Sequence, residues 1–470
     1  MNLSLYNSLT RKKVPFQPMV DGEVKIYTCG PTIYHYVHIG NLRTFIVEDL
    51  LRRTLRYFNY KVTQVMNLTD VDDKTIRGAI AEKIPLNVFT NKYKEAFFED
   101  LKTLHIEPVE FYPQATDYIP EMIQMIEKLM EKGMAYKGGD KSIYYPIEKF
   151  PKYGCLSHFK LEDLKTGASK RVTADEYEKE HIADFVLWKA YDETRDGDIY
   201  WESPFGKGRP GWHLECSAMA MTLLGETLDI HMGGIDNLFP HHENEIAQSE
   251  ACSGKPFVNL WMHSEHLIVE GKKMSKSLGN FFTLRDLIEK GYSGIEIRYM
   301  LLHTHYKTQL NFTFSGLEGI RGSLQRLQDF IYRLNTVSFE KEGNKVSPYL
   351  AKAKEEFEKG LSDDLNISHA LASLFDLVRE VNALIDQKSL SYKEAKQVLS
   401  LLESFNKVLG ILDFTEKSSE ATYEVQELFQ ERLAARQAKN WALADQLRIK
   451  IHEKGYLIED SPQGARLKKG

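Results

Sequence analysis

The segment His38–Asn41, with the sequence HIGN, combines side chains that could bind a phosphate. It opens a predicted helix, where unpaired backbone N–H groups and the helix dipole favour an anion. Gly40 would let a nucleotide approach the backbone closely. For these four residues alone, the alternative is that Asn41 only caps the helix while His38 lies in a surface loop.

A second candidate phosphate site is Gly271–Asn280, GKKMSKSLGN, which carries Lys272, Lys273 and Lys276 between glycines. A mobile loop of this kind could bring ammonium groups onto a polyphosphate. A solvated basic turn is the alternative when the segment is read alone. The presence of both motifs in one chain favours a shared nucleotide site.

Four side chains could form a metal site: Cys29, Cys216, His241 and Glu245. His241 and Glu245 are four residues apart and would share one helical face. Two thiolates, one imidazole and one carboxylate make an acceptable zinc shell. Spacing leaves two alternatives open, because the cysteines could be buried structural thiols and because His242 and Glu243 could compete as ligands.

The segment HMGGIDN follows a predicted strand and supplies Gly233, Gly234 and Asp236. Its glycines would allow an adenosine to approach the backbone closely. An ordinary turn is the alternative.

Three further groups are weaker candidates. The acidic run TDVDDK at 69–74 lacks the Gly and the distal Glu of an EF-hand loop, which favours a capped helix start. Cys155 and Cys252 have no identifiable partner and are interpreted as structural or incidental thiols. The two histidines of residues 303–305 could ligate a metal, but packing or an RNA contact is favoured.

The elements around HIGN predict a βαβ unit. Residues 24–29 and 62–66 have the composition of strands, and apolar residues from Asn41 onward recur at helical spacing. Strand, loop, helix and strand within about 45 residues fit a crossover between parallel strands. Such a sheet binds its ligand at the carboxyl edge of the strands, and Cys29 ends the first of them.

The chain is predicted to be an α/β protein with a Rossmann-type parallel sheet split by an insertion. From about residue 315 to 415 nearly all of the sequence has helical periodicity, and residues 421–470 begin as helix and end as a short polar tail. The predicted divisions are the first half of the sheet domain at 1–120, an inserted connective module at 121–225, the second half with the KMSKS loop at 226–314, a helical bundle at 315–415 and a small C-terminal domain at 416–470.

Length and composition exclude several classes of protein. With 470 residues, 42% of them hydrophobic, the chain is too long for a single core. Its apolar runs are far shorter than the ~18 residues that span a bilayer, and its first residues do not form a signal peptide, which predicts a cytoplasmic protein with no membrane partner. Four cysteines are too few for a disulfide framework.

The net charge of -6 argues against a general basic coat but leaves room for a local basic patch. Residues 421–470 hold 9 Lys or Arg against 7 Asp or Glu, a balance of +2. Arg432, Arg436 and Lys439 recur there at helical spacing and could form one face that meets phosphates. A solvated basic face is the alternative.

HIGN followed by KMSKS is the paired signature of class I aminoacyl-tRNA synthetases, and the chain resembles the cysteinyl-tRNA synthetase family in particular. Four segments carry this resemblance: YTCGPTIYHYVHIGNLRTF (27–45), NLTDVDDK (67–74), RPGWHLECSAMAM (209–221) and HMGGIDNLFPHHENEIAQSE (231–250). One position departs from the family, since the first motif often ends in His and here ends in Asn41. Asn can donate a hydrogen bond to a phosphate but carries no charge.

The resemblance implies that zinc is bound by Cys29, Cys216, His241 and Glu245. Zinc binds a thiolate far better than a hydroxyl, which would distinguish cysteine from serine more sharply than an apolar pocket and make editing unnecessary. Trp212 precedes Cys216 by four residues and could form a wall of this pocket, with simple packing beside the Pro/Gly turn as the alternative.

The resemblance further implies ATP-dependent ligation of L-cysteine to tRNA(Cys) through a cysteinyl-adenylate. His38 and Asn41 would hold the triphosphate, and Lys276, assisted by Lys273, would neutralise the leaving pyrophosphate. Mg²⁺ would accompany ATP, and the HMGGIDN segment would contact the nucleotide or the amino acid. The two halves of the sheet domain would be catalytic, the C-terminal domain would bind the anticodon, and the chain would act as a monomer.

Three alternatives remain open. A ligase of the same fold could transfer activated cysteine to a small amino sugar, although such an acceptor needs no anticodon-binding region. A non-catalytic RNA-binding homologue could retain the scaffold without the reaction. A structural zinc protein would have a closed metal shell, and neither of the last two would show cysteine-dependent ATP–pyrophosphate exchange.

Overall fold

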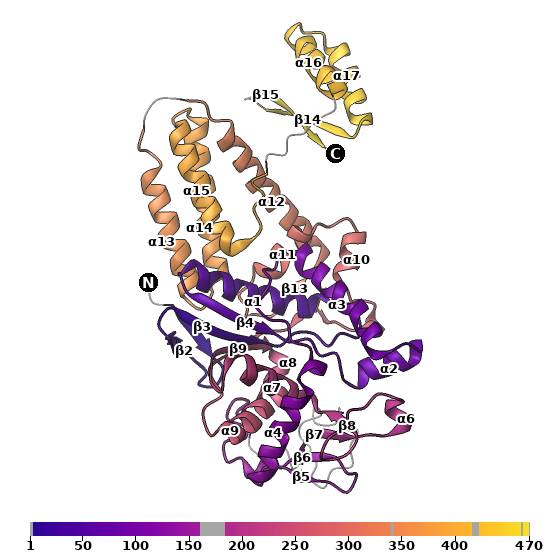
Figure 1. Cartoon of the computed structure of the whole chain (residues 1–470). Coiled ribbons are helices and arrows are strands. Elements are labelled where there is room, and N and C mark those ends of the chain that lie inside the picture. The colour runs from indigo at the N-terminus through magenta and orange to yellow at the C-terminus, as the bar shows by residue number, and fades with distance from the viewer. Residues whose placement is uncertain (1–2, 160–183, 340–342, 416–422, 462–463, 470) are drawn as a thin grey trace. The chain divides into compact units, whose positions relative to one another are not determined.

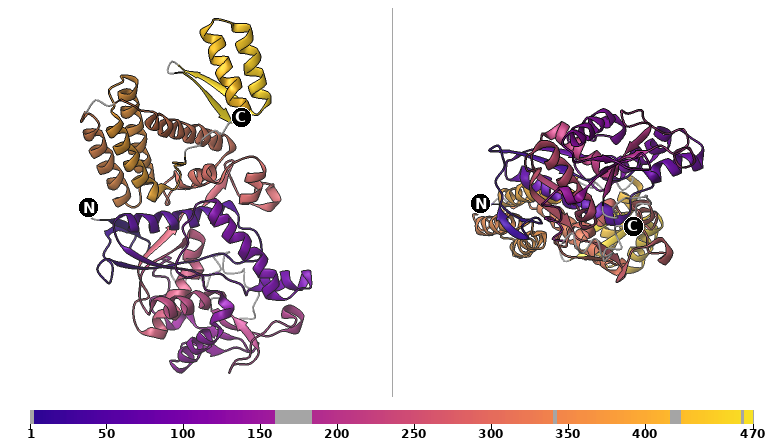
Figure 2. Two further views of the ribbon diagram at one scale, coloured as in Figure 1. Left: turned by 45° about the horizontal axis from the view of Figure 1, so that its top comes forward. Right: turned by 90° about the horizontal axis from the view of Figure 1, so that it is seen from below.

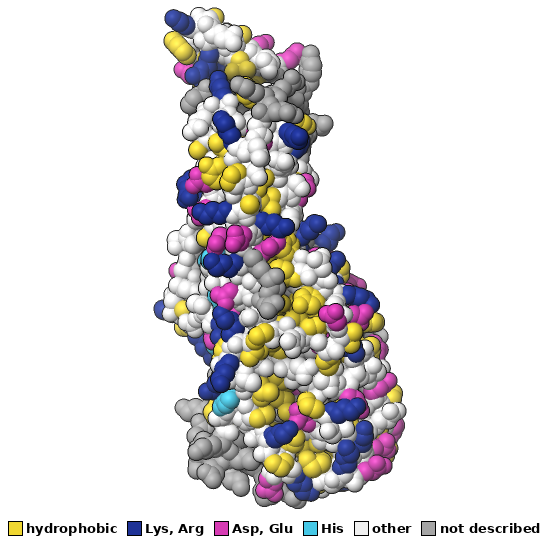
Figure 3. All heavy atoms as spheres, turned by 90° about the vertical axis from the view of Figure 1, so that its left-hand side faces the viewer, with side chains coloured by type: hydrophobic (Ala, Val, Ile, Leu, Met, Phe, Trp, Pro, Cys, Tyr) yellow, Lys and Arg dark blue, Asp and Glu magenta, His cyan; other side chains and the backbone are white. Residues whose placement is uncertain are grey.

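The structure is a computed structural model that describes residues 3–159, 184–339, 343–415, 423–461 and 464–469. The chain forms two compact units, Met1–Leu412 and Asp413–Gly470. No helix among the described residues is both long and apolar enough to cross a bilayer. On the face shown in Figure 3, basic and acidic side chains are interspersed rather than gathered into a basic coat.

A parallel four-stranded sheet lies at the centre of the first unit (Figure 1), in the order β10-β9-β3-β4. Its strands are β3 (Glu23–Thr28), β4 (Lys61–Met66), β9 (Leu228–Gly234) and β10 (Val258–Ser264). β3 pairs with β4 on one edge and with β9 on the other, so that Tyr27 lies opposite His231. The expected Rossmann-type sheet split by an insertion is confirmed.

Helix α1 (Ile39–Tyr57) connects β3 to β4 and covers one face of the sheet, whereas α7 (Trp212–Leu224) and α9 (Glu243–Ser253) lie on the other face (Figure 1). The apolar residues that predicted α1, such as Leu42 and Leu50, are buried against the sheet.

The start of α1 differs from the expectation in one respect. The N-cap is His38, whose ring Nδ1 accepts a hydrogen bond from the Asn41 backbone N–H at 3.3 Å. The interpretation in which Asn41 caps the helix is therefore wrong. The Asn41 side chain is exposed and remains available to a ligand.

Between β4 and β9 the chain forms helices and a second, antiparallel sheet in the order β5-β6-β7-β8. The elements are α2 (Asp73–Glu82), α3 (Leu86–Thr103), η1 (Ala115–Tyr118), α4 (Ile119–Glu131), β5 (Tyr136–Lys137), β6 (Ile143–Tyr145), η2 (Ile147–Lys149), β7 (Phe185–Ala190), α6 (Glu193–Asp196) and β8 (Gly208–Pro210). One hydrophobic core contains Tyr27 of β3, Leu187 of β7 and Met219 of α7. The inserted segment therefore shares its core with the parallel sheet.

The remaining elements of the first unit before the bundle are short. They are β1 (Ser4–Asn7), β2 (Lys12–Pro15), α8 (Ile235–Asn237), η4 (Leu238–His242), β11 (Leu267–Val269), β12 (Lys272–Lys273), η5 (Lys276–Leu278), α10 (Leu284–Glu289), α11 (Gly294–Leu302) and β13 (Leu310–Phe312). β11 pairs with β13 in parallel and with β12 in antiparallel fashion. The KMSKS segment thus begins on an edge strand.

Four helices form the expected bundle: α12 (Phe314–Asn335), α13 (Ser347–Ser362), α14 (Ile367–Asp386) and α15 (Tyr392–Leu409). α13 and α14 run side by side (Figure 2). Arg298 of α11 is fully buried and donates to Asp49 of α1 at 2.6 Å and to the Leu409 carbonyl of α15 at 2.8 Å. This arginine joins the bundle to the helix that carries HIGN.

The second unit consists of α16 (Tyr423–Gln437), α17 (Trp441–Glu453) and an antiparallel hairpin of β14 (Tyr456–Ser461) and β15 (Gly464–Lys469). The hairpin corrects the expectation of a polar tail, because Ile458 of β14 packs in the core of this unit.

Two of the three basic residues of the possible phosphate-binding face pair with one acid of the same unit. Arg432 is buried and pairs with Asp460 at 2.7 Å, and Arg436 pairs with the same carboxylate. One carboxylate therefore offsets part of the charge of these two arginines, and only Arg432 is buried.

Removal of one ring from the bundle should lower stability strongly. Phe357 and Phe405 are fully buried, with stacked rings whose centroids are 3.9 Å apart. Phe357→Ala should cost about 3–5 kcal/mol of unfolding free energy, because it leaves a cavity. Val88→Ala, at a side chain 51% exposed, should change stability by no more than about 0.5 kcal/mol. Equal shifts in urea denaturation would contradict the assignment of this core.

Candidate metal centre and nucleotide cavity

The structure brings the four predicted metal-binding side chains together from distant parts of the fold. Cys29 directly follows β3, Cys216 lies on α7, His241 lies in η4 and Glu245 lies in the first turn of α9. Their ligand atoms all lie within 4.8 Å of one another, and all four side chains are buried. Residues from distant parts of the sequence thus form one compact set of donors.

Two donor atoms of this set lack hydrogen-bond partners. Nε2 of His241 and Oε1 of Glu245 are buried, lie 3.0 Å apart and make no hydrogen bond of good geometry. Buried polar atoms are normally paired. A cation between them and the two sulfurs would satisfy both atoms, and two sulfurs, one nitrogen and one oxygen suit zinc. The residues present therefore fit a zinc ion.

Two of the four donors are ionised at neutral pH, whereas burial raises the pKa of the Cys29 thiol and Glu245, against the effect of burial, raises the pKa of His241 to about 10. Burial opposes ionisation of Cys216, but the neighbouring Cys29 thiol and the charge of His241 lower the Cys216 pKa to about 6. Burial likewise opposes ionisation of Glu245, and His231 and His241 lower its pKa to about 2. A thiolate and a carboxylate are thus available at neutral pH, as metal binding requires.

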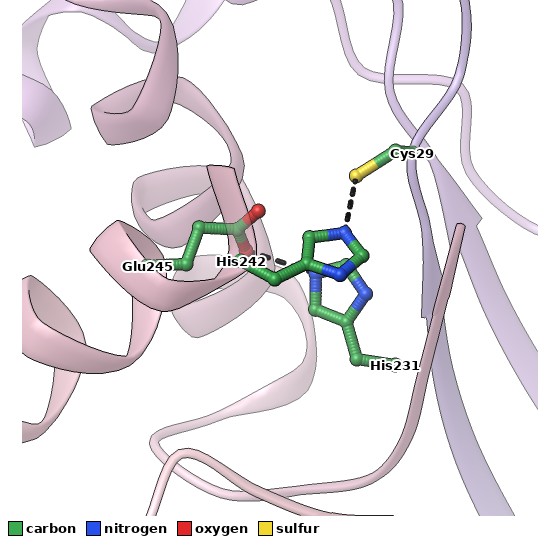
Figure 4. Close-up of side chains that lie close together, drawn as sticks. All are labelled: Cys29, His231, His242 and Glu245. Atoms are coloured by element: carbon green, nitrogen blue, oxygen red, sulfur yellow. Dashed lines mark hydrogen bonds and ion pairs between the residues drawn. The ribbon is translucent and has the colours of Figure 1, made fainter. Parts of the chain in front are cut away.

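A second set of donors overlaps the first (Figure 4). It consists of Cys29, His231, His242 and Glu245 and shares two side chains with the predicted set. His242 already has partners on both ring nitrogens, with its Nε2 3.4 Å from Cys29 Sγ and its Nδ1 2.9 Å from His263 Nε2. His231 Nε2 contacts Glu245 Oε2 at 2.9 Å. These imidazoles therefore surround the predicted donors.

Sequence reasoning named His242 as a competing ligand but did not single out His213, His231 or His263. The available signal was a histidine in the buried strand β9, next to a cluster of possible ligands. Glu243, the other named competitor, lies outside both donor sets. Its carboxylate instead accepts hydrogen bonds from the backbone N–H groups of Gly154 at 2.8 Å and Ser157 at 2.7 Å.

A cavity of about 530 Å³ lies at the carboxyl edge of the parallel sheet. Its lining includes Cys29 and Asn67, which directly follow β3 and β4, and Gly234 and Ser264, which are the last residues of β9 and β10. Trp212 also lines it, and its ring stacks on His241 with a centroid separation of 3.9 Å. Trp212 therefore lies beside His241, one of the predicted donors.

The N-terminus of α1 opens into the same cavity, where His38, Gly40 and Asn41 form part of the lining. Burial lowers the His38 pKa to about 4, so the ring is neutral at physiological pH. Because its Nδ1 accepts from Asn41, the ring proton is assigned to Nε2, which can donate to a phosphate. A side chain at Gly40 would meet the His38 ring at 3.0 Å and Met274 at 3.2 Å.

The two predicted lysines occupy different positions. Lys273 lines the cavity, whereas Lys276 is exposed and absent from the lining. The Lys276 ammonium lies 5.2 Å from the centroid of Phe281, and that ring contacts His38 edge-on with centroids 5.3 Å apart. Lys276 would therefore have to move to reach a phosphate in the cavity.

The three predicted residues of the HMGGIDN segment also differ in whether they line the cavity. Gly234 and Asp236 line the cavity, but Gly233 does not. A side chain at Gly233 would meet Asn237 at 2.9 Å and the His242 ring at 3.0 Å. The absent side chain at Gly233 therefore makes room for neighbouring protein atoms.

The weaker candidates have structural roles. Asp72 caps α2, as the helix-start interpretation expected. Cys155 and Cys252 belong to neither donor set, and burial raises the pKa of both thiols. His303 and His305 contact backbone carbonyls, at 2.8 Å in each case, and belong to no donor set among the described residues.

Comparison with known proteins decides the family. Residues 15–321 match the family model described as tRNA synthetases class I (C) catalytic domain, and residues 356–413 match the DALR domain. The cysteine–tRNA ligase of Protochlamydia amoebophila (strain UWE25) is 64% identical over 467 residues, which cover 99% of this chain and 98% of that protein. The chain belongs to the cysteine–tRNA ligase family.

A second member of the family, from Chlamydia felis (strain Fe/C-56), is 55% identical over 472 residues and covers 100% of this chain and 98% of its own. Among solved structures, Mycobacterium tuberculosis methionyl-tRNA synthetase in complex with methionyl-adenylate superposes with a TM-score of 0.61. That match has 14% identity and covers 83% of this chain and 88% of the other. It shows the shared class I fold.

Loss of one sulfur should release the metal. Cys216→Ala should reduce bound zinc from about one ion per chain to a small fraction of that, because three donors bind it far more weakly. Cys252→Ala removes another buried thiol of the same unit and should leave the metal content unchanged. Elemental analysis after gel filtration measures both, and equal zinc in the two variants would contradict the predicted set.

Proposed function

We propose that this ligase joins L-cysteine to tRNA(Cys) in two steps. A carboxylate oxygen of cysteine attacks the α-phosphorus of ATP, and pyrophosphate leaves with the electrons of the broken P–O bond. A hydroxyl of the terminal ribose of the tRNA then attacks the cysteinyl carbonyl, and AMP leaves. Both steps depend mainly on positioning and charge stabilisation rather than on a strong acid or base.

One observation carries the proposal: a single cavity contains both the sulfur-rich donor set and the N-terminus of α1. Cys29, Cys216 and His241 line the cavity together with His38 and Asn41. An amino acid held at the donor set would have its carboxylate directed towards a nucleotide phosphate at the helix. The helix N-terminus favours that anion.

The side chains of the cavity have distinct proposed roles. His38 Nε2–H and the Asn41 amide would donate to the triphosphate, and Lys273 would approach it from the KMSKS loop. Gly40, Gly234 and Asp236 would border the nucleotide, for which Mg²⁺ is the expected companion. When bound, zinc would supply a ligand position that favours a thiolate over a hydroxyl, and Trp212 would shield it from water.

The regions outside the catalytic half support a tRNA substrate. Residues 356–413 match the DALR domain, and a relative aligns over 99% of the chain. A ligase with an amino-sugar acceptor would not need the helices of this C-terminal region. We assign anticodon binding to the C-terminal unit. A cytoplasmic, monomeric enzyme remains our expectation.

Amino-acid-dependent ATP–pyrophosphate exchange tests the activation step. Exchange should require cysteine, and serine should support it at no more than about a hundredth of that rate, since a hydroxyl is the poorer zinc ligand. Metal-depleted enzyme should lose this difference while retaining ATP binding. Equally strong rejection of serine without metal would show that zinc does not select the substrate.

Aminoacylation of a tRNA with a GCA anticodon tests the transfer step. A variant that ends at Leu412, the boundary of the first unit, should retain cysteine-dependent exchange. Its kcat/KM for tRNA should fall by about a hundredfold or more, because anticodon contacts are lost. Undiminished aminoacylation by this variant would contradict anticodon binding by the C-terminal unit.

Lys276 should act in the transition state rather than in cysteine binding. Lys276→Ala should reduce the rate of adenylate formation about a hundredfold through loss of charge stabilisation at pyrophosphate. The equilibrium constant for cysteine binding should change little. Lys290→Ala is a matched control, because Lys290 is also exposed and its ammonium lies over an aromatic ring, that of Phe314. Equal losses in rate and cysteine affinity would contradict this role.

A further inference from the structure

Arg43 of α1 is a buried arginine held entirely by backbone oxygen atoms. Its side chain is 0% exposed. Nη1 donates to the carbonyls of Glu265 and His266, both at 2.9 Å, and Nη2 donates to those of His305 at 3.3 Å and Thr308 at 2.5 Å. No ion pair between described residues includes Arg43. Because the guanidinium group is rigid, its N–H groups fix the positions of the four carbonyl groups.

These carbonyls belong to two loops that shape the cavity. Glu265 and His266 connect β10 to β11 and line the cavity directly. His305 and Thr308 precede β13, which pairs with β11 in parallel. Two bonds between the loops, from the Glu265 N–H to the Tyr306 carbonyl and from the Leu310 N–H to the His266 carbonyl, complete this arrangement. Arg43 therefore connects the helix of HIGN to the opposite wall of the cavity.

The charge of Arg43 also matters to an anionic ligand. Burial lowers its pKa to about 10, with Glu265 acting in the opposite direction, so the guanidinium stays protonated at neutral pH. The cavity lining contains two carboxylates, Asp236 and Glu265, against the single ammonium of Lys273. A buried cation in the first turns of α1 adds to the positive end of the helix dipole, where a phosphate would bind.

We propose that Arg43 is a positioning residue for the nucleotide. It fixes the backbone of residues 265 and 266 as one wall of the nucleotide site and adds positive potential beneath the phosphates. It does not touch the ligand, and the donor set for the amino acid lies on other elements. The inference rests on the proposed function only in taking ATP as the nucleotide.

Arg43→Lys gives the sharpest test, because lysine keeps the charge but has only three N–H donors for the four carbonyls. Its KM for ATP in cysteine-dependent pyrophosphate exchange should rise about tenfold or more, while the KM for cysteine should change less than about threefold. Arg298→Lys is the matched control. Arg298 is equally buried and donates to three carbonyls and to Asp49, all outside the cavity.

The comparison separates positioning from simple packing. Both variants should lose thermal stability, but only Arg43→Lys should weaken binding of a fluorescent ATP analogue. The proposal is overturned if Arg298→Lys raises the KM for ATP to the same extent, or if Arg43→Lys raises both KM values equally. Wild-type enzyme without cysteine-dependent exchange would instead contradict the proposed function, and nucleotide binding by the same variants would still test Arg43.

A second variant keeps the test available if Arg43→Lys does not fold. Thr308 is exposed and contributes a carbonyl to Arg43. Thr308→Gly should loosen this loop without disturbing the core, because glycine adds backbone freedom. The KM for ATP should rise about threefold at constant KM for cysteine, and an unchanged KM for ATP would count against the proposal.

Discussion

The pairing of β3 with β9 is the constraint on which the site depends. The two strands are parallel, with Tyr27 opposite His231, so their carboxyl ends meet at one edge of the sheet. Cys29 then lies beside the segment that leads into α9 with His241 and Glu245. Neither half of the chain contains the complete donor set or the complete cavity lining. Pairing of the two strands brings the halves together and completes both.

This arrangement places strongly polar groups inside an apolar core. Cys29 and Cys216 belong to the same hydrophobic cluster as Leu187 and Met219, and Glu245 is fully buried beside them. Burying a carboxylate and a thiolate costs free energy unless opposite charges offset it. The surrounding imidazoles offset part of that cost, and a cation bound only by the folded state would add stability. Binding of a cation at this donor set would therefore be linked to folding.

Local sequence patterns predicted the elements that the site needs. Composition and apolar spacing indicated β3, α1, β4 and β9, two motifs predicted the phosphate-binding residues, and the family resemblance predicted the metal-binding residues. The remaining features depend on contacts between distant segments. Only the three-dimensional structure shows the four carbonyls around Arg43, the imidazoles around Glu245 and the packing of Ile458. The cap at His38 was missed because histidine is not among the usual capping residues.

The separation of β3 from β9 along the chain also governs the order in which the protein can form during synthesis. A nascent chain that has not reached residue 228 lacks β9, so one edge of β3 has no strand to pair with. Synthesis at about 5–20 residues per second leaves that edge open for many seconds. Unpaired edge strands recruit other chains. The geometry that assembles the site late therefore makes the unfinished enzyme vulnerable to association.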